Sequence, residues 1–169
     1  MSDDFQTLRD EFIAHWGALG SQWGVNRTMA MIHALLLISV RPLTTDEVME
    51  QLQISRGNAS TNLRELVDWG LLQRVVRPGE RRDYFAAEKD VWKIFCVIAR
   101  ERKRRETVPA QQVLESCVER SRAFHSADAR EFHERLKALS EFVDLANTVM
   151  ERIAATEQNA VVPRLLKLF

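Results

Sequence analysis

Apolar side chains recur at helical spacing along most of the chain. From Phe5 to Leu19 they follow steps of three and four residues, which is one face of an α-helix, and Gly20 is expected to end that helix. A second helix over 27–40 is apolar nearly all round. We therefore expect it to lie at the buried centre of the fold, with Pro42 closing it off.

Two short helices follow, and their capping residues are the sharpest local signal. Thr44 and Glu47 have the spacing of a capping box, which predicts a helix over 45–52. Ser55 is the next good N-cap and predicts a helix over 56–69, closed by Gly70. The second helix turns its apolar side inward through Ala59, Leu63 and Leu66.

The hydrophobic period then changes from 3.6 to two residues. Residues 72–76 and 83–86 are expected to form two short strands, joined by a turn with Pro78 and Gly79 at its centre. Two short helices followed by a hairpin are the order of a winged helix-turn-helix. The predicted fold class is mainly α with a small two-stranded β-wing: a winged helix-turn-helix plus helical dimerisation arms.

After the hairpin the pattern is helical again. Helices are expected over about 90–105, with Val91, Phe95 and Ile98 inward, from Pro109 onward, and over 128–153. The last helix carries a heptad pattern with polar residues between, which favours dimerisation, although the same residues could pack within their own chain. Its apolar positions are Phe132, Leu136, Leu139, Val143, Ala146, Met150 and Ile153.

The predicted 56–69 helix carries side chains of the kinds that read DNA. A helix in the major groove needs short polar side chains and arginines on its outward face, and a glycine such as Gly57 leaves room for close approach. Arginine suits guanine or phosphate, asparagine suits adenine, and serine or threonine suit either contact. The candidates are Ser55, Arg56, Gly57, Asn58, Ser60, Thr61, Asn62 and Arg64.

The hairpin tip adds three more candidate DNA contacts. Arg77, Arg81 and Arg82 stand beside the acids Glu80 and Asp83. A wing of this kind can follow the DNA backbone or insert an arginine into a narrow minor groove. The alternative is a solubilising loop in which the arginines pair with the two acids.

Three strings in this region resemble the GbsR-like branch of the MarR-type winged-helix regulators. They are LTTDE at 43–47, SRGNASTNLREL at 55–66 and GERRDYF at 79–85, whereas AAEKD at 86–90 departs from the Leu-Thr-x-x-Gly of broader MarR proteins. The resemblance implies a dimer that binds a near-palindromic operator in double-stranded DNA, usually as a repressor and often with a small-molecule effector.

GbsR-like proteins include sensors of choline-type quaternary ammonium compounds, and such cations are held over aromatic rings. Two interpretations stay open for the aromatic residues of the flanking helices: an effector cage, or ordinary core packing. These residues are Trp16, Trp23, Trp92 and Phe95.

Composition limits the alternatives. Lysine plus arginine number 24 and aspartate plus glutamate number 24, so the chain has no general polybasic coat. The two cysteines, Cys96 and Cys117, form no CxxC pair and fit a reducing cytoplasm, and no histidine spacing suggests a metal site. No catalytic motif or membrane-length apolar run occurs, so we expect no enzyme activity, no cofactor and no membrane partner.

The predicted organisation has three parts: N-terminal helices at 1–40, a DNA-binding unit at 41–89 and a helical dimerisation region at 90–169. The function this favours is a dimeric, sequence-specific transcriptional repressor. Two alternatives stay open, namely a winged-helix module that binds proteins without DNA, and a thiol-based redox regulator.

Overall fold

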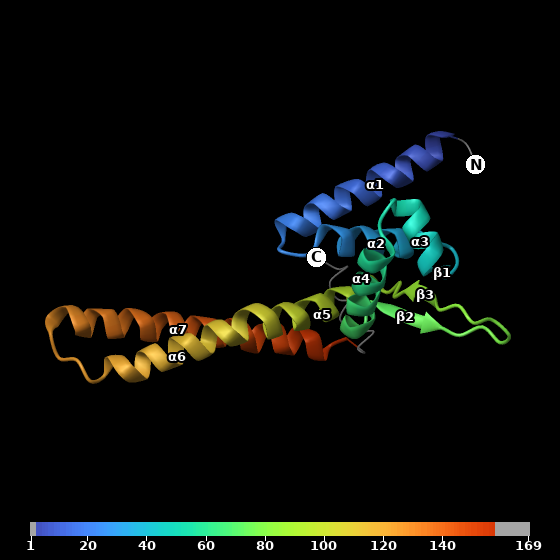
Figure 1. The fold of residues 1–169 in the computed structure, drawn as a ribbon. Helices are drawn as coiled ribbons and strands as arrows, with labels where there is room; N and C mark the ends of the chain where they lie inside the picture. The colour runs from blue at the N-terminus through green and yellow to red at the C-terminus, as the bar shows by residue number, and fades with distance from the viewer. Residues whose placement is uncertain (1–2, 158–169) are drawn as a thin grey trace, which may run out of the picture. The chain divides into compact units, whose positions relative to one another are not determined.

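A computed structural model of the chain describes residues 3–157 and is divided into two compact units between residues 91 and 92 (Figure 1). The first unit contains α1 (Asp3–Gln22), α2 (Arg27–Ile38), β1 (Leu43–Thr44), α3 (Thr45–Leu52), α4 (Arg56–Trp69), β2 (Leu72–Val75) and β3 (Tyr84–Ala87). After it come α5 (Val91–Arg102), the π-helix η1 (Lys103–Thr107), α6 (Val108–Ser121) and α7 (Ala127–Ala155). The predicted fold class, mainly helical with a small antiparallel sheet beside a helix-turn-helix, is confirmed.

The core of the first unit is built around α2, as its all-round apolar pattern predicted. This helix contacts α1, α3, α4 and β3. It ends at Ile38 rather than at Val40: the backbone of Ser39 is extended, with ψ of 134°, and the Ser39 hydroxyl donates to the Leu35 carbonyl of the last turn at 2.6 Å. Its most deeply buried side chains are Met29, Ile32, Ala34, Leu35 and Leu36.

Helix α1 differs from the sequence prediction in its end and in its buried side. Gly20 does not stop the helix, which continues to Gln22. Gly20 is buried, and a Cβ there would lie 2.5 Å from the Ala30 Cβ, so the glycine lets α1 cross α2 closely. The face turned to α2 includes Ile13, while Phe5 is 50% exposed. Close backbone approach through small residues therefore decides which side of α1 is buried.

The sheet has three strands where the sequence predicted two. The order is β1-β3-β2, all antiparallel, with Leu43 opposite Phe85 and Val75 opposite Tyr84. The additional strand β1 has two residues, too few to show an alternating pattern. It adds a third strand at the base of the wing, just before the N-terminus of α3.

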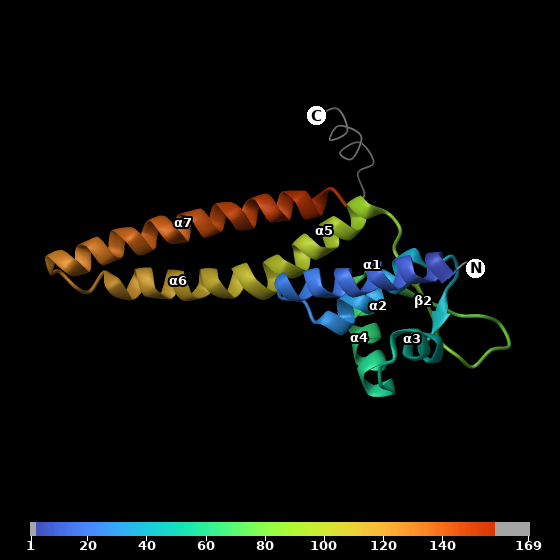
Figure 2. The ribbon, with the colours of Figure 1, turned by 90° about the horizontal axis from the view of Figure 1, so that it is seen from above.

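In the second unit, α5, η1 and α6 form one continuous helical run that bends, and α7 returns alongside it (Figure 2). The sequence predicted a break before Pro109, but the backbone stays helical there. Proline has no N–H to donate to the carbonyl four residues earlier, and in the preceding turn the Val108 N–H bonds five residues back to Lys103. The π-turn thus takes the place of the expected loop.

The inward side of α5 also differs from the prediction. Val91 is 74% exposed and Phe95 is 48% exposed, whereas Ile94 and Val97 are buried. Ile98, the third residue expected inward, is half-buried. The buried stripe is therefore displaced by one residue from the predicted one, which rotates the helix by about 100°. Residues 158–169 of the predicted dimerisation region lie outside the described residues.

Candidate nucleic-acid interface

Helix α4 turns one side to the core and the other to solvent. Ala59, Leu63 and Leu66 are buried, as their spacing predicted. Ser55 caps the helix by accepting a backbone N–H of the first turn at 3.3 Å, and Gly70 closes it with φ of 86°. The outward side is therefore a surface fixed at both ends by caps and from behind by the core.

The outward side of α4 carries short side chains and one unpaired cation. Gly57, Thr61 and Arg64 are exposed and lie at helical spacing on a single stripe. Ser60 beside them is half-buried. Arg64 has no carboxylate partner among residues 3–157. Its guanidinium is free to pair with a guanine edge or a phosphate.

Asn62 does not join this outward surface, contrary to the sequence prediction. It is 5% exposed, and its Nδ2 donates to the backbone oxygen of Asn58 at 2.8 Å and to the Asn58 Oδ1 at 2.7 Å. The Asn58 Nδ2 in turn donates to the Thr28 Oγ1 at 3.4 Å. Asn62 is thus a residue that orients Asn58, and Asn58 is the exposed amide of the pair.

Arg56 is tied to the preceding helix. Its Nη2 lies 2.5 Å from the Asp46 Oδ1 of α3, with the two side chains 68% and 50% exposed. An ion pair this exposed contributes little stability, and a phosphate can replace the carboxylate at small cost. Sequence reasoning missed Asp46, which no spacing rule links to a residue ten positions later.

The wing is formed by β2, β3 and the loop between them. The Glu80 N–H donates to the Arg77 carbonyl at 3.1 Å and Gly79 has φ of 83°, which confirms the predicted turn around Pro78 and Gly79. Arg81 and Arg82 are exposed and have no carboxylate partner within the described part of the chain. The tip therefore carries two unpaired guanidinium groups.

Arg77 differs from its two neighbours because it is engaged inside the wing. Its guanidinium lies 4.1 Å from the centre of the Tyr84 ring and 3.9 Å from the Glu80 carboxylate. The Tyr84 hydroxyl donates to the same carboxylate, which raises the pKa of Tyr84. Arg77 therefore stabilises the loop through contacts within the wing. This role depends on Tyr84 facing Arg77 across the hairpin, so local sequence spacing does not predict it.

The N-terminus of α3 is fixed by a carboxylate at the base of the wing. Glu47 accepts the Thr44 N–H at 2.7 Å and pairs with the Arg41 guanidinium at 2.6 Å. The Arg41 guanidinium, together with the Thr44 hydrogen bonds, lowers the pKa of Glu47 to about 2. A polar groove of about 410 Å³ lies here, between α3 and the wing residues Arg82 and Tyr84.

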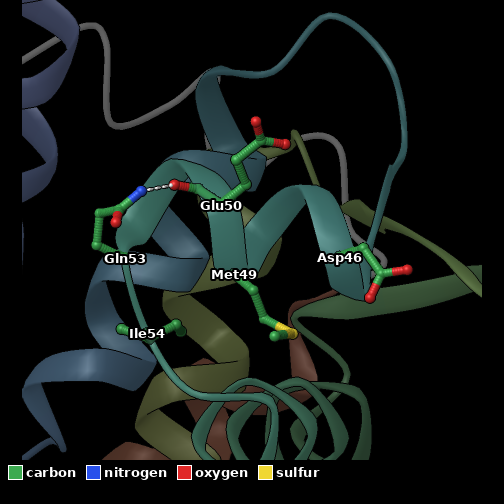
Figure 3. Close-up of a pocket in the computed structure, with 5 residues that line it drawn as sticks. All are labelled: Asp46, Met49, Glu50, Gln53 and Ile54. Carbon is green, nitrogen blue, oxygen red and sulfur yellow. Dashed lines mark hydrogen bonds between the residues drawn. The ribbon is translucent and has the colours of Figure 1, made fainter.

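A second groove, of about 440 Å³, is lined by α3 and the turn that follows it (Figure 3). Its lining residues are Asp46, Met49, Glu50, Gln53 and Ile54, and the Gln53 Nε2 donates to the Glu50 carbonyl at 2.6 Å. Gln53 holds the turn between the two helices with φ of 53°, a left-handed conformation unusual for a side chain with a Cβ. The lining carries two carboxylates and no cation, so it is not complementary to phosphate.

Comparison with known proteins relates this region to a family. The MarR family model matches residues 23–83, from the turn before α2 to the end of the wing loop. The HTH-type transcriptional repressor GbsR of Bacillus subtilis (strain 168) is 30% identical over 73 residues, which are 43% of this chain and 40% of GbsR. Residues 23–83 are thus similar to the MarR family.

Other similarities agree with the assignment of this MarR-family segment. The HTH-type transcriptional repressor OpcR of the same strain is 25% identical over 73 residues, again 43% of this chain and 40% of that protein. The matched stretch thus spans less than half the length of either relative. The crystal structure of a transcriptional regulator superimposes with a TM-score of 0.68 over 89% of this chain and 97% of that one, at 21% identity. That likeness concerns the fold.

The aromatic residues considered as an effector cage fall in both units. On α1, before the MarR-family segment, the rings of Phe12 and Trp16 are 5.7 Å apart. On α5 the rings of Trp92 and Phe95 are 5.4 Å apart. Trp23 is 58% exposed. Each unit thus contains a tilted aromatic pair.

The predicted dimerisation residues of α7 divide into two groups. Phe132 and Leu139 are 55% and 49% exposed, while the other five are half-buried in a helix that packs against α6 and η1. A second apolar stripe on α7, which sequence reasoning missed, is more exposed. It consists of Phe142, Leu145 and Val149, at 67%, 59% and 48%.

The remaining chemistry of the chain is buried or dispersed. Cys96 is fully buried with its Sγ donating to the Ile153 carbonyl at 3.4 Å, and Cys117 is half-buried. Burial lowers the pKa of His33 to about 4, so this histidine is neutral in the core. Within residues 3–157 no three potential metal ligands gather, and no helix is long and apolar enough to cross a bilayer.

Proposed function

We propose that this protein is a sequence-specific DNA-binding transcription regulator of the repressor type that acts as a homodimer. The observation that carries the proposal is the outward stripe of α4, where Gly57, Thr61 and Arg64 are exposed and Arg64 is unpaired among the described residues. This stripe lies on a helix whose other side is locked into the core. Such a helix can enter a major groove without rearrangement.

The distribution of charge along α4 and the wing supports the same conclusion. From Ser55 to Arg64 the helix has two arginines and no acid, whereas Glu65 and Asp68 occupy its last turns. The wing tip adds Arg81 and Arg82, both exposed. The cations of α4, which precede its acidic last turns, and those of the wing tip match a duplex whose charge lies along its two backbones.

The first experiment is selection of bound duplexes from a random pool by the purified full chain. We expect an enriched, near-palindromic sequence, because a two-fold dimer reads two half-sites. The dissociation constant for that duplex should rise steeply with salt as phosphate contacts are lost. No enriched sequence, or a flat salt response, would instead indicate a winged helix that binds proteins.

Arg64→Ala tests the assignment of the helix directly. We expect it to weaken binding to the selected duplex by about 1–3 kcal/mol, the value of one good base contact. Glu134→Gln, an exposed position on α7, is the matched control and should bind as the wild type does. Equal affinity of Arg64→Ala and the control would remove Arg64 from the interface.

For dimerisation we propose the exposed stripe of Phe142, Leu145 and Val149 rather than the predicted heptad. Contiguous exposed apolar side chains on one helix favour association with an equivalent helix. Leu145→Glu should therefore sediment as a monomer under conditions where the wild type and Glu134→Gln are dimers. If Leu145→Glu remains a dimer, the dimer interface lies instead at the heptad residues Phe132 and Leu139, or on another surface.

The last part of the proposal concerns location and effector. The protein acts in the cytoplasm and binds a small-molecule effector, a quaternary ammonium compound held over aromatic faces. The close rings of Trp92 and Phe95 support it. Calorimetry with choline and betaine should give heat with the wild type and less with Trp92→Leu. No heat with either compound would assign these rings to core packing.

Loss of an oxidant response in Cys96→Ser or Cys117→Ser would favour the redox alternative.

A further inference from the structure

Gly57 is the one glycine that nothing inside the protein requires. The chain has six glycines, and all of them lie among the described residues. Gly57 is in the first turn of α4, is exposed, and has helical backbone angles. A Cβ built on it would meet no protein atom within 4 Å. An alanine would therefore fit this position in the free protein.

The other five glycines each have a reason within the fold. Two sit where α1 crosses α2, and a Cβ on either would come within 2.5 Å of a side chain. Three have φ between 75° and 86°, a region that side chains with a Cβ rarely adopt. The two groups are Gly17 and Gly20, and Gly24, Gly70 and Gly79.

Glycine is also an unfavourable choice in a helix. It loses more chain entropy on folding than alanine, a cost that is largest in a helix interior and small in the first turn. The free protein thus gains nothing from glycine at position 57 and loses some stability. A molecule that approaches the backbone too closely for a methyl group supplies the missing reason.

The stripe that contains Gly57 shows from which direction that molecule comes. Along the outward face of α4, side-chain size increases from Gly57 to Thr61 to Arg64, and Asp68 follows in the last turn. Space for a neighbour is therefore greatest at the N-terminal end. An acid at the far end would repel DNA phosphates, which indicates that the last turn lies away from the duplex.

We propose that α4 docks tilted, with its first turn deepest in the major groove and the Gly57 Cα against base-pair edges on the groove floor. This inference rests on the proposed function and adds to it the orientation of the helix and the residue of closest approach. A side chain at position 57 occupies the space of a base edge, so its effect depends on sequence. A methyl group there leaves the phosphate contacts of Arg81 and Arg82 in place.

The test compares the wild type, Gly57→Ala and Asp68→Asn as full chains. Each is titrated, with fluorescence anisotropy as the readout, against the duplex that the wild type selects from a random pool and against a scrambled duplex of equal length. Gly57→Ala should lose about tenfold or more in affinity for the selected duplex and none for the scrambled one. Asp68→Asn should keep the wild-type ratio between the two duplexes.

Thermal unfolding completes the test because the two effects of Gly57→Ala have opposite signs. Its Tm should equal or exceed that of the wild type, so that weaker binding cannot come from damage to the fold. Undiminished binding of Gly57→Ala overturns the close approach, and an equal loss on both duplexes overturns the placement on the groove floor. A lowered Tm overturns the claim that the fold does not require this glycine. A wild type that selects no sequence overturns the proposed function itself.

Discussion

Replacing Glu47 by glutamine removes one negative charge from the point where α3, β1 and the base of the wing meet. Glu47 pairs with Arg41 at 2.6 Å and accepts the Thr44 N–H at 2.7 Å. Glutamine keeps an oxygen for the backbone N–H but loses the ion pair. The substitution therefore removes the charge of the capping box and keeps its hydrogen bond to the Thr44 N–H.

The pKa of Glu47 sets the expected size of the effect. Arg41 is the main cause of its fall from 4.5 to about 2, which if fully realised would correspond to about 3 kcal/mol. Arg41 is 55% exposed, however, and water screens such a pair. Glutamine keeps the capping hydrogen bond, so only the ion pair is lost, and an exposed pair of this kind leads us to expect a loss of at most about 1 kcal/mol at pH 7.

The pH dependence provides the stricter test. At pH 7 the carboxyl is charged in both the folded and the unfolded state, so the full stabilisation is present. Below its ordinary pKa of 4.5 the unfolded state takes up the proton first, and the contribution falls until it is lost near pH 2. Wild type and Glu47→Gln should therefore differ in free energy of unfolding at pH 7 and converge as the pH falls toward 2.

Urea denaturation followed by far-UV circular dichroism measures this difference at neutral and acidic pH. Glu50→Gln, an exposed carboxylate on the same helix, is the matched control and should change stability little at either pH. An unfolding free energy for Glu47→Gln that is equally reduced at pH 7 and near pH 3 would refute the reasoning, because the loss could not then come from the charge.

Three further substitutions test the backbone and packing assignments by the same denaturation assay. Gln53→Gly should stabilise the chain by about 0.5 kcal/mol, because it relieves a left-handed φ of 53° at the cost of greater unfolded-chain entropy. Gly20→Ala should destabilise it by about 1 kcal/mol or more, since its methyl would lie 2.5 Å from the Ala30 Cβ. Lys89→Met should cost about 1 kcal/mol, because the Lys89 ammonium donates to three carbonyls at the end of α2, at 2.5–3.0 Å. No change, or a change of opposite sign, would contradict each assignment.

The helix-turn-helix could be predicted residue by residue because local interactions determine it. The Thr44 capping box and the Ser55 cap set the starts of α3 and α4, and the left-handed Gly70 sets the end of α4. Each of these signals lies within four residues of the element it bounds. The predicted limits of both helices therefore agree with the structure.

Asn62 shows where residue type misled the prediction. Positions 59, 62, 63 and 66 have the spacing of one buried helical face, so the pattern alone placed Asn62 inward. Its amide favoured an outward role, yet a buried amide is stable when it is hydrogen-bonded, and Asn58 supplies both acceptors. Periodicity was the better guide at this position.

The features that could not be predicted depend on partners distant in sequence. The two-residue strand β1 exists because Leu43 pairs with Phe85, more than forty positions away. The π-turn η1 depends on Pro109 and on α7, where Asn147 accepts from the Thr107 hydroxyl. The Arg77 contact with Tyr84 follows from the register of a hairpin whose loop length had to be known first.

The net charge of zero hides how few cations the proposed interface keeps free. Between residues 53 and 86, three arginines are paired with carboxylates: Arg56 with Asp46, Arg74 with Asp83 and Arg77 with Glu80. Three others have no carboxylate partner among residues 3–157: Arg64, Arg81 and Arg82.

A dimer therefore offers six unpaired arginines, and if all of them meet phosphates, the logarithm of affinity should fall with the logarithm of salt with a slope of about −5. If DNA also displaces the three carboxylates on each protomer, the slope approaches about −11. A phosphate could replace the Asp46 carboxylate at small cost, because screening leaves the exposed Arg56–Asp46 pair little stability of its own. With so few free cations, discrimination between duplexes has to come from fit along α4, where the chain keeps a glycine that its own fold does not need.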